Sequence, residues 1–232
     1  MSSSPSPAPD LAIRPSLISR TVGGFGTSIV VGGALGAAAW FSDQLQWPYS
    51  LLIPANMIGI WLGVAFALGA SARTIPTGAL RGLIGLLAAV AVYYLLFAIL
   101  GAGYRAIGAG HAATVWGLVA LLAGPVMGGA GAVWRHASGR PRATAVAVLA
   151  AALIAEGVVF GVTRLVHVDR LANDPGALLY AAEIAIGAAL PAILLRKGER
   201  FSGYAVTAGF AILAAVAIGP VTAILRGLAD RF

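Results

Sequence analysis

The chain contains no cysteine among its 232 residues, so a disulfide scaffold and a cysteine-ligated metal site are both excluded. Charge is also scarce, because charged residues make up 10% of the sequence against about 25% in soluble domains. Hydrophobic residues, by contrast, reach 59%. A soluble domain of this length has too little interior to bury so much apolar surface. The composition therefore predicts a protein that folds in a lipid bilayer.

The sequence motifs of common membrane enzymes are missing as well. There is no HExxH metal site, no cluster of histidines, no aspartate-rich prenyltransferase motif and no glycine-rich phosphate loop followed by lysine. The segments between the apolar stretches are too short for an extramembrane catalytic domain. We therefore expect no metal and no cofactor, and an enzyme is the less favoured class.

Seven apolar stretches are long enough to cross a bilayer core about 30 Å thick, which takes about 20 helical residues. They cover residues 21–41, 51–72, 79–101, 112–134, 144–167, 177–195 and 202–225. The sequence thus predicts an all-α bundle of about seven transmembrane helices, with six as the alternative. Pro54 interrupts the second stretch, whose helix could begin near Asn56 after an irregular lead-in. We expect a disordered cytoplasmic tail at 1–20, one transmembrane domain at 21–226 and a short tail at 227–232.

The basic residues predict the orientation of the bundle. There are 15 of them against 8 acidic residues, and all but Lys197 are arginine. With seven spans and a cytoplasmic N-terminus, ten basic residues fall on the inner side and five on the outer side, as the positive-inside rule requires. Arginine-rich, lysine-poor usage is typical of GC-rich bacterial genomes, so we expect the bacterial inner membrane. Because the basic residues lie in short segments between apolar runs, they indicate contact with anionic lipid headgroups and not with nucleic acid. The headgroup candidates are Arg135, Arg140, Arg142, Arg196, Lys197 and Arg200.

Polar groups inside the bilayer are costly, so Glu156 near the middle of the fifth stretch is the most informative residue. It could carry a proton, bind a ligand or act as a catalytic acid. It could equally be a protonated carboxyl that hydrogen-bonds a neighbouring helix as a structural contact. The sequence leaves these alternatives open.

Glu183 and Arg164 lie at similar depths on consecutive antiparallel stretches. Their proximity predicts a structural ion pair, or alternatively two groups that line a cavity open to the outside. Asn56, Tyr93 and Tyr94 lie in the outer half of the bundle, and the tyrosines are too deep for an interfacial belt. We predict an outward-facing pocket with Glu156 as its floor. Its candidate lining residues are Asn56, Trp61, Tyr93, Tyr94, Glu156, Arg164 and Glu183.

Several apolar motifs resemble a known family. They are the stretch from Pro54 to Phe66, the pair Tyr93-Tyr94, and Trp116 followed by Gly124-Pro125 and by the run from Gly128 to Arg135. Together they resemble an uncharacterised, domain-of-unknown-function family of bacterial multi-pass membrane proteins. The resemblance covers about residues 25–225 and implies membrane residence, but no activity.

Three functions agree with these features. The first is binding or transport of a small hydrophobic or polar molecule through the outward-facing pocket. The second is an accessory or scaffold subunit, which would bind a membrane partner or a second copy of the chain through small-residue grooves. The third is an intramembrane enzyme, similar to terpene cyclases, that uses Glu156 as its acid. We favour the first.

Overall fold

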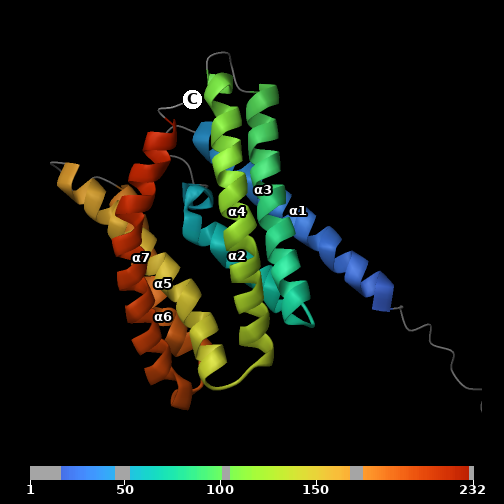
Figure 1. Ribbon diagram of the computed structural model, residues 1–232, viewed down its shortest axis with the longest axis vertical. Coiled ribbons are helices and arrows are strands. Elements are labelled where there is room, and N and C mark those ends of the chain that lie inside the picture. The colour runs from blue at the N-terminus through green and yellow to red at the C-terminus, as the bar shows by residue number, and fades with distance from the viewer. Residues whose placement is uncertain (1–16, 45–52, 101–104, 168–174, 230–232) are drawn as a thin grey trace, which may run out of the picture.

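The computed structural model describes the backbone of residues 17–44, 53–100, 105–167 and 175–229 (Figure 1). Within these ranges the chain forms α-helices and 3-10 turns and contains no strand, so the predicted all-α fold is confirmed. The elements are α1 (Leu17–Gln44), η1 (Ile53–Asn56), α2 (Ile58–Ala70), α3 (Ile75–Leu100), α4 (Arg105–His136), α5 (Arg140–His167), α6 (Pro175–Leu194), η3 (Lys197–Glu199) and α7 (Arg200–Ala229).

Each of the seven apolar stretches overlaps one of these α-helices, but the helices differ in length. Counting the described residues alone, four contain a segment long and apolar enough to cross a membrane, namely Gly24–Gln44, Ile75–Leu100, Ala112–His136 and Arg140–Gly161. The apolar segments Ile58–Ala70 and Leu178–Leu194 are shorter. The apolar helices are therefore compatible with a membrane protein, whereas the count of seven full spans remains a prediction.

Helix α2 begins late because the chain before it cannot continue a helix. Pro54 lies in the 3-10 turn η1, and Met57, the N-cap residue, is extended with φ −77° and ψ 130°. The remaining 13 residues rise about 20 Å, which is less than the thickness of the bilayer core. The irregular lead-in that Pro54 indicated is thus present. Helix α2 starts inside the bundle, and the N–H groups of its first turn have no carbonyl acceptor within the helix.

Helix α2 lies at the centre of the bundle and joins its two halves. It contacts α3 and α4 on one side and α5 on the other (Figure 1). On the first side Ala65 packs in a buried cluster with Leu86 and Met127. On the second side Phe66 packs with Leu149 and Leu153. Since both clusters include residues of α2, a shift of this short helix changes the packing of both halves.

Glycine allows the closest approach between helices α3 and α4. A methyl group added at Gly128 would overlap the carbonyl oxygen of Gly78, and one added at Gly82 would overlap that of Gly124. The backbones therefore touch directly, as small residues permit in membrane bundles. The glycine-rich run around Pro125 serves packing here.

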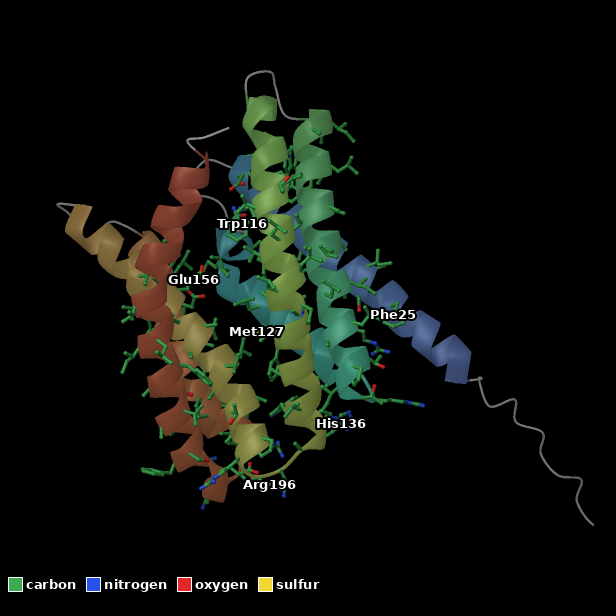
Figure 2. All side chains as sticks on the ribbon, viewed as in Figure 1. Phe25, Trp116, Met127, His136, Glu156 and Arg196 are labelled. Atoms are coloured by element: carbon green, nitrogen blue, oxygen red, sulfur yellow. The ribbon has the colours of Figure 1, made fainter. Side chains whose placement is uncertain are left out.

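The turns α2–α3, α4–α5 and α6–α7 lie together at one end of the bundle. The ring nitrogen Nε2 of His136 is 2.8 Å from the carbonyl oxygen of Ala72, and the Gly139 N–H donates to Glu199 Oε1 over 2.6 Å. Figure 2 shows His136 and Arg196 at this end, away from Trp116 in the other half of the molecule. These bonds join the three turns into one surface.

The basic residues predicted to meet lipid headgroups all lie on this surface. The exposed ones are Arg135, Arg140, Arg196 and Lys197. Arg142 and Arg200 are partly buried and donate to the carbonyl oxygens of Leu194 and Leu195, each over 3.3 Å. These carbonyls end α6, where a cation is favourable to the helix dipole. Headgroup contact by the six residues stays a prediction.

Glu199 is expected to make the stability of this end depend on pH. The hydrogen bond from the Gly139 N–H lowers the pKa of its carboxyl. A lowered folded-state pKa stabilises the protein above the unfolded pKa, about 4.3, and this contribution is lost as the pH falls through the folded value. We expect wild type to melt slightly above Glu199→Gln near pH 7 and the two to converge below about pH 4. A melting difference that is constant from neutral to acid pH would contradict this assignment.

Candidate functional site

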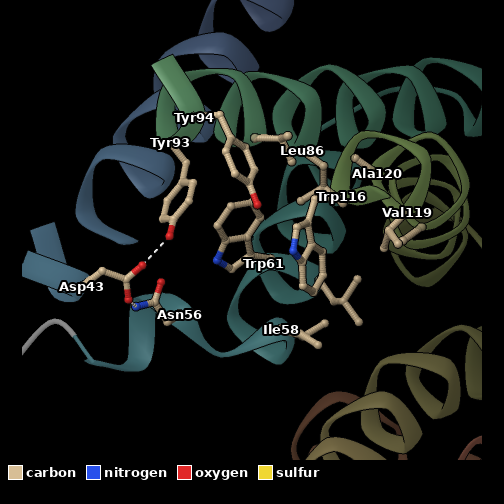
Figure 3. A pocket seen from close by; sticks show the side chains of 13 residues that line it. Asp43, Asn56, Ile58, Trp61, Leu86, Tyr93, Tyr94, Trp116, Val119 and Ala120 are labelled. Carbon is tan, nitrogen blue, oxygen red and sulfur yellow. Dashed lines mark hydrogen bonds between the residues drawn. The ribbon is translucent and has the colours of Figure 1, made fainter. Parts of the chain in front are cut away.

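A pocket of about 230 Å³ opens between the end of α1, η1, α2, α3 and α4 (Figure 3). Most of its wall is aliphatic or aromatic, with a few polar groups at one edge. Pockets for drug-sized ligands have volumes of about 300–1,000 Å³, so this one suits a smaller molecule. We call it the aromatic pocket, and its lining residues are Asp43, Asn56, Ile58, Trp61, Leu62, Leu86, Val90, Tyr93, Tyr94, Trp116, Val119, Ala120 and Ala123.

The polar edge of the aromatic pocket is built around Asp43. Its carboxylate accepts a hydrogen bond from the Asn56 amide over 2.5 Å and another from the Tyr93 hydroxyl (Figure 3). Both of these partners are neutral donors, so they orient the carboxylate without neutralising its charge. Two carboxylate oxygens can accept about four hydrogen bonds, so further acceptor capacity remains. Asp43 and Asn56 are exposed, which places this edge at the mouth of the pocket.

Four aromatic side chains form the wall behind Asp43. Trp61 is fixed by a 2.6 Å hydrogen bond from its indole N–H to the carbonyl of Ala55. Tyr93 and Tyr94 meet edge to face, with ring centroids 4.9 Å apart. Tyr94 extends toward Trp61, and Trp116 approaches from α4 (Figure 3). Aromatic rings beside an unneutralised carboxylate create a region of negative potential.

The carboxylate of Glu156 occupies a different position, at the first turn of α2. Its Oε1 accepts the Ile58 N–H over 2.8 Å, and its Oε2 accepts the Gly59 N–H over 2.5 Å. The N-cap residue Met57 supplies no side-chain cap. Glu156 therefore caps α2 from another helix, at the end where the helix dipole favours a negative charge.

Glu183 points at the same turn from α6. It is 4% exposed, and neither carboxyl oxygen makes a hydrogen bond of ordinary geometry. A methyl group at Gly59 would overlap Glu183 Oε1 and would lie 3.3 Å from Glu156 Oε2. The two carboxyls thus converge on one glycine, and the polar neighbour of Glu183 is the carboxyl of Glu156.

A model of a family of unknown function, DUF6518, matches residues 15–227, which is nearly the whole chain. The chain belongs to this family. The expected membership in a family of unknown function is thereby confirmed, and it brings no assigned activity. No curated protein and no solved structure matches the chain.

In this DUF6518 chain four of the predicted pocket residues line one cavity, namely Asn56, Trp61, Tyr93 and Tyr94. Glu156 and Glu183 do not belong to that lining; their carboxyls meet at the first turn of α2 instead. Glu156 therefore does not form the floor that we expected, and the lining includes aliphatic side chains such as Leu86. What any of these residues binds remains a prediction.

The ion pair between Arg164 and Glu183 stays a prediction. The side chain of Arg164 lies outside the described side chains. On the described side, Glu183 faces Glu156. Within the described residues, no group of three or more histidine, cysteine, aspartate or glutamate side chains could hold a metal ion.

The polar residue that sequence reasoning missed is Asp43. It follows the first apolar stretch, where an acidic residue reads as an ordinary loop residue. One signal was available, since Asp43 is the only acidic residue between Asp10 and Glu156. Its contact with Tyr93 joins residues fifty positions apart, which no local pattern indicates.

Proposed function

We propose that this DUF6518 chain is a multi-pass membrane protein that binds a small organic cation in the aromatic pocket. The observation that carries the proposal is the carboxylate of Asp43, held at the mouth by two neutral donors in front of four aromatic side chains. Binding of this kind serves either capture or transport of the ligand.

The chemistry of the lining favours a cation over a neutral or anionic ligand. A cation placed over an aromatic face gains about 0.5–2 kcal/mol, and more where water is excluded. The remaining charge of Asp43 attracts the same ligand and repels anions. The aliphatic residues deeper in the pocket favour alkyl substituents on the cation, so a substituted ammonium fits better than a metal ion.

The arrangement of the basic residues supports a pocket that opens outward. The turns α2–α3, α4–α5 and α6–α7 lie at the basic end, which we assign to the cytoplasm by the positive-inside rule. Asp43 follows the first span, so with a cytoplasmic N-terminus it lies on the outer side. Residues 21–226 would then form one transmembrane domain of the bacterial inner membrane, in contact with lipid and not with nucleic acid.

The contacts of Glu156 weigh against the enzymatic alternative. A catalytic acid needs a proton and access to a substrate, whereas this carboxylate already accepts two backbone N–H groups and is 6% exposed. A scaffold role would leave the aromatic pocket without a ligand, so a measurement of cation binding separates the scaffold from the binding protein that we propose.

The test uses choline and its neutral analogue 3,3-dimethylbutan-1-ol, which share a shape but differ in charge. Protein in lipid nanodiscs is titrated with each, and binding is followed by calorimetry and by tryptophan fluorescence, to which Trp61 and Trp116 in the pocket contribute. We expect choline to bind and Asp43→Asn to weaken it at least about tenfold, since the Coulomb attraction is lost. The neutral analogue should bind weakly to both proteins.

A matched control is Glu199→Gln, which removes one negative charge at the opposite end of the bundle. It should leave choline binding unchanged. Equal affinity for choline and the alcohol, equal affinity in wild type and Asp43→Asn, or no choline binding at all would overturn the cation proposal.

A further inference from the structure

Glu183 is a buried acid without a hydrogen-bond partner of ordinary geometry, which is a costly arrangement for a charged group. It is 4% exposed on the apolar helix α6, and both of its oxygens are unsatisfied. An isolated ionised carboxylate in such surroundings loses many kcal/mol of hydration, so it takes up a proton or finds a partner.

The neighbouring carboxyl of Glu156 is the partner that the geometry offers. Gly59 has no side chain, and this lets the two carboxyls approach the same point. Glu156 uses one lone pair on each oxygen for the N–H groups of Ile58 and Gly59, and each oxygen retains another. A protonated Glu183 can donate its O–H to one of these, which gives its acid proton an acceptor.

The charged groups on the packed helices do not supply a counter-ion to this pair among the described side chains. Helix α2 carries no charged residue, and Glu183 is the only one within α6. On α5 the described cations, Arg140 and Arg142, lie at its other end, where Arg142 is bonded to Leu194. On α7, Arg200 is bonded to Leu195. Among the described side chains, Glu156 and Glu183 thus meet across Gly59 with no cation beside them. Two adjacent carboxylates are an arrangement that proteins avoid by sharing a proton.

We propose that Glu156 and Glu183 form a binding site for a single proton, and that this proton is coupled to the aromatic pocket through the first turn of α2. The proton resides on Glu183, because the backbone N–H groups and the helix dipole favour the charged form of Glu156. Its release leaves a Glu183 carboxylate, and the proton passes to solvent.

Ile58 is the physical link between the two sites. Its backbone N–H is bonded to Glu156 Oε1, and the residue also lines the aromatic pocket. When Glu183 loses its proton, repulsion between the two carboxylates pushes Glu156 away from Glu183 and strains its bonds to α2. A displacement of α2 moves Ile58 and Trp61, and hence changes the pocket wall.

The proton itself is tested without any ligand, by infrared spectroscopy of the full chain in nanodiscs at pH 7. A protonated carboxyl has a C=O stretch that a carboxylate lacks. We expect one such band in wild type, its loss in Glu183→Gln and its retention in Glu199→Gln. Glutamine mimics the protonated acid, so Glu183→Gln should fold.

Absence of the band in wild type would overturn the proton site whether or not the variant folds. Retention of the band in a folded Glu183→Gln, or in Glu183→Leu if glutamine fails to fold, would do the same. The coupling has its own readout, since choline affinity should vary with pH in wild type and not in Glu183→Gln. A pH dependence that survives in the variant would overturn the coupling.

The two proposals fail separately. Loss of choline binding in Asp43→Asn tests the aromatic pocket, and the infrared band tests the proton site with no ligand present. If choline does not bind, the cation proposal falls while the proton site stands on its band. If the band is absent, the pocket is untouched.

Discussion

Glu156→Ala is expected to lower the free energy of unfolding by about 3–6 kcal/mol, because it removes two hydrogen bonds to a charged group at about 1.5–3 kcal/mol each. Ile58 and Gly59 would keep their N–H groups inside the bundle with no acceptor, since Met57 provides no cap. Glu183 would lose its polar neighbour in the same step. Water can replace these contacts only if it enters between α2, α5 and α6.

Two further substitutions separate capping from a general loss of volume. Glu156→Gln retains a carbonyl oxygen for one N–H but turns its amide toward the other, so we expect about half of the loss. Glu199→Ala removes an acid that accepts two backbone hydrogen bonds at an exposed turn. We expect it to lower the free energy of unfolding much less than Glu156→Ala does. Unfolding free energies measured by steric trapping in bilayer-like micelles provide the comparison. If Glu156→Ala and Glu199→Ala cost the same, Glu156 is not the cap of α2.

Hydropathy was sufficient to predict the helices, because lipid requires long apolar segments with internally satisfied backbones. Each apolar stretch overlaps an α-helix, and Pro54 correctly indicated that the second begins irregularly. The depth of Tyr93 and Tyr94 also indicated that they face inward, and both line the pocket. These predictions succeed because each follows from the properties of a single residue or a single segment, without knowledge of which distant residues it contacts.

The contacts that define the two sites could not be predicted in that way. The sequence showed that burying Glu156 in a membrane is costly, but its hydrogen-bond partners are backbone N–H groups 98 and 97 residues away. Every residue except proline has a backbone N–H, so the sequence does not indicate which ones bind Glu156. On depth and charge alone Arg164 was the predicted partner of Glu183, and that ion pair stays a prediction. The convergence of Glu183 on Glu156 depends on the missing side chain at Gly59, which is one of 31 glycines.

Gly128→Ala is expected to destabilise the bundle by about 1–3 kcal/mol or more, as overpacking does in close-packed interiors. Its new methyl group would overlap the Gly78 carbonyl oxygen, and the obstacle is backbone, which cannot rotate away as a side chain can. Helices α3 and α4 must then separate or slide. Because α2 packs against both, the separation also reaches the aromatic pocket.

Gly117→Ala on the same helix is the matched control, because nothing lies within 4 Å of the added methyl group. Alanine exceeds glycine in helix propensity by about 1 kcal/mol, so this control should be neutral or stabilising. The two substitutions are chemically identical and should differ in sign when unfolding is measured in the same micelles. Equal effects on the free energy of unfolding would show that the backbones of α3 and α4 are not in contact. The part of the pocket wall that these two helices form would then be placed incorrectly.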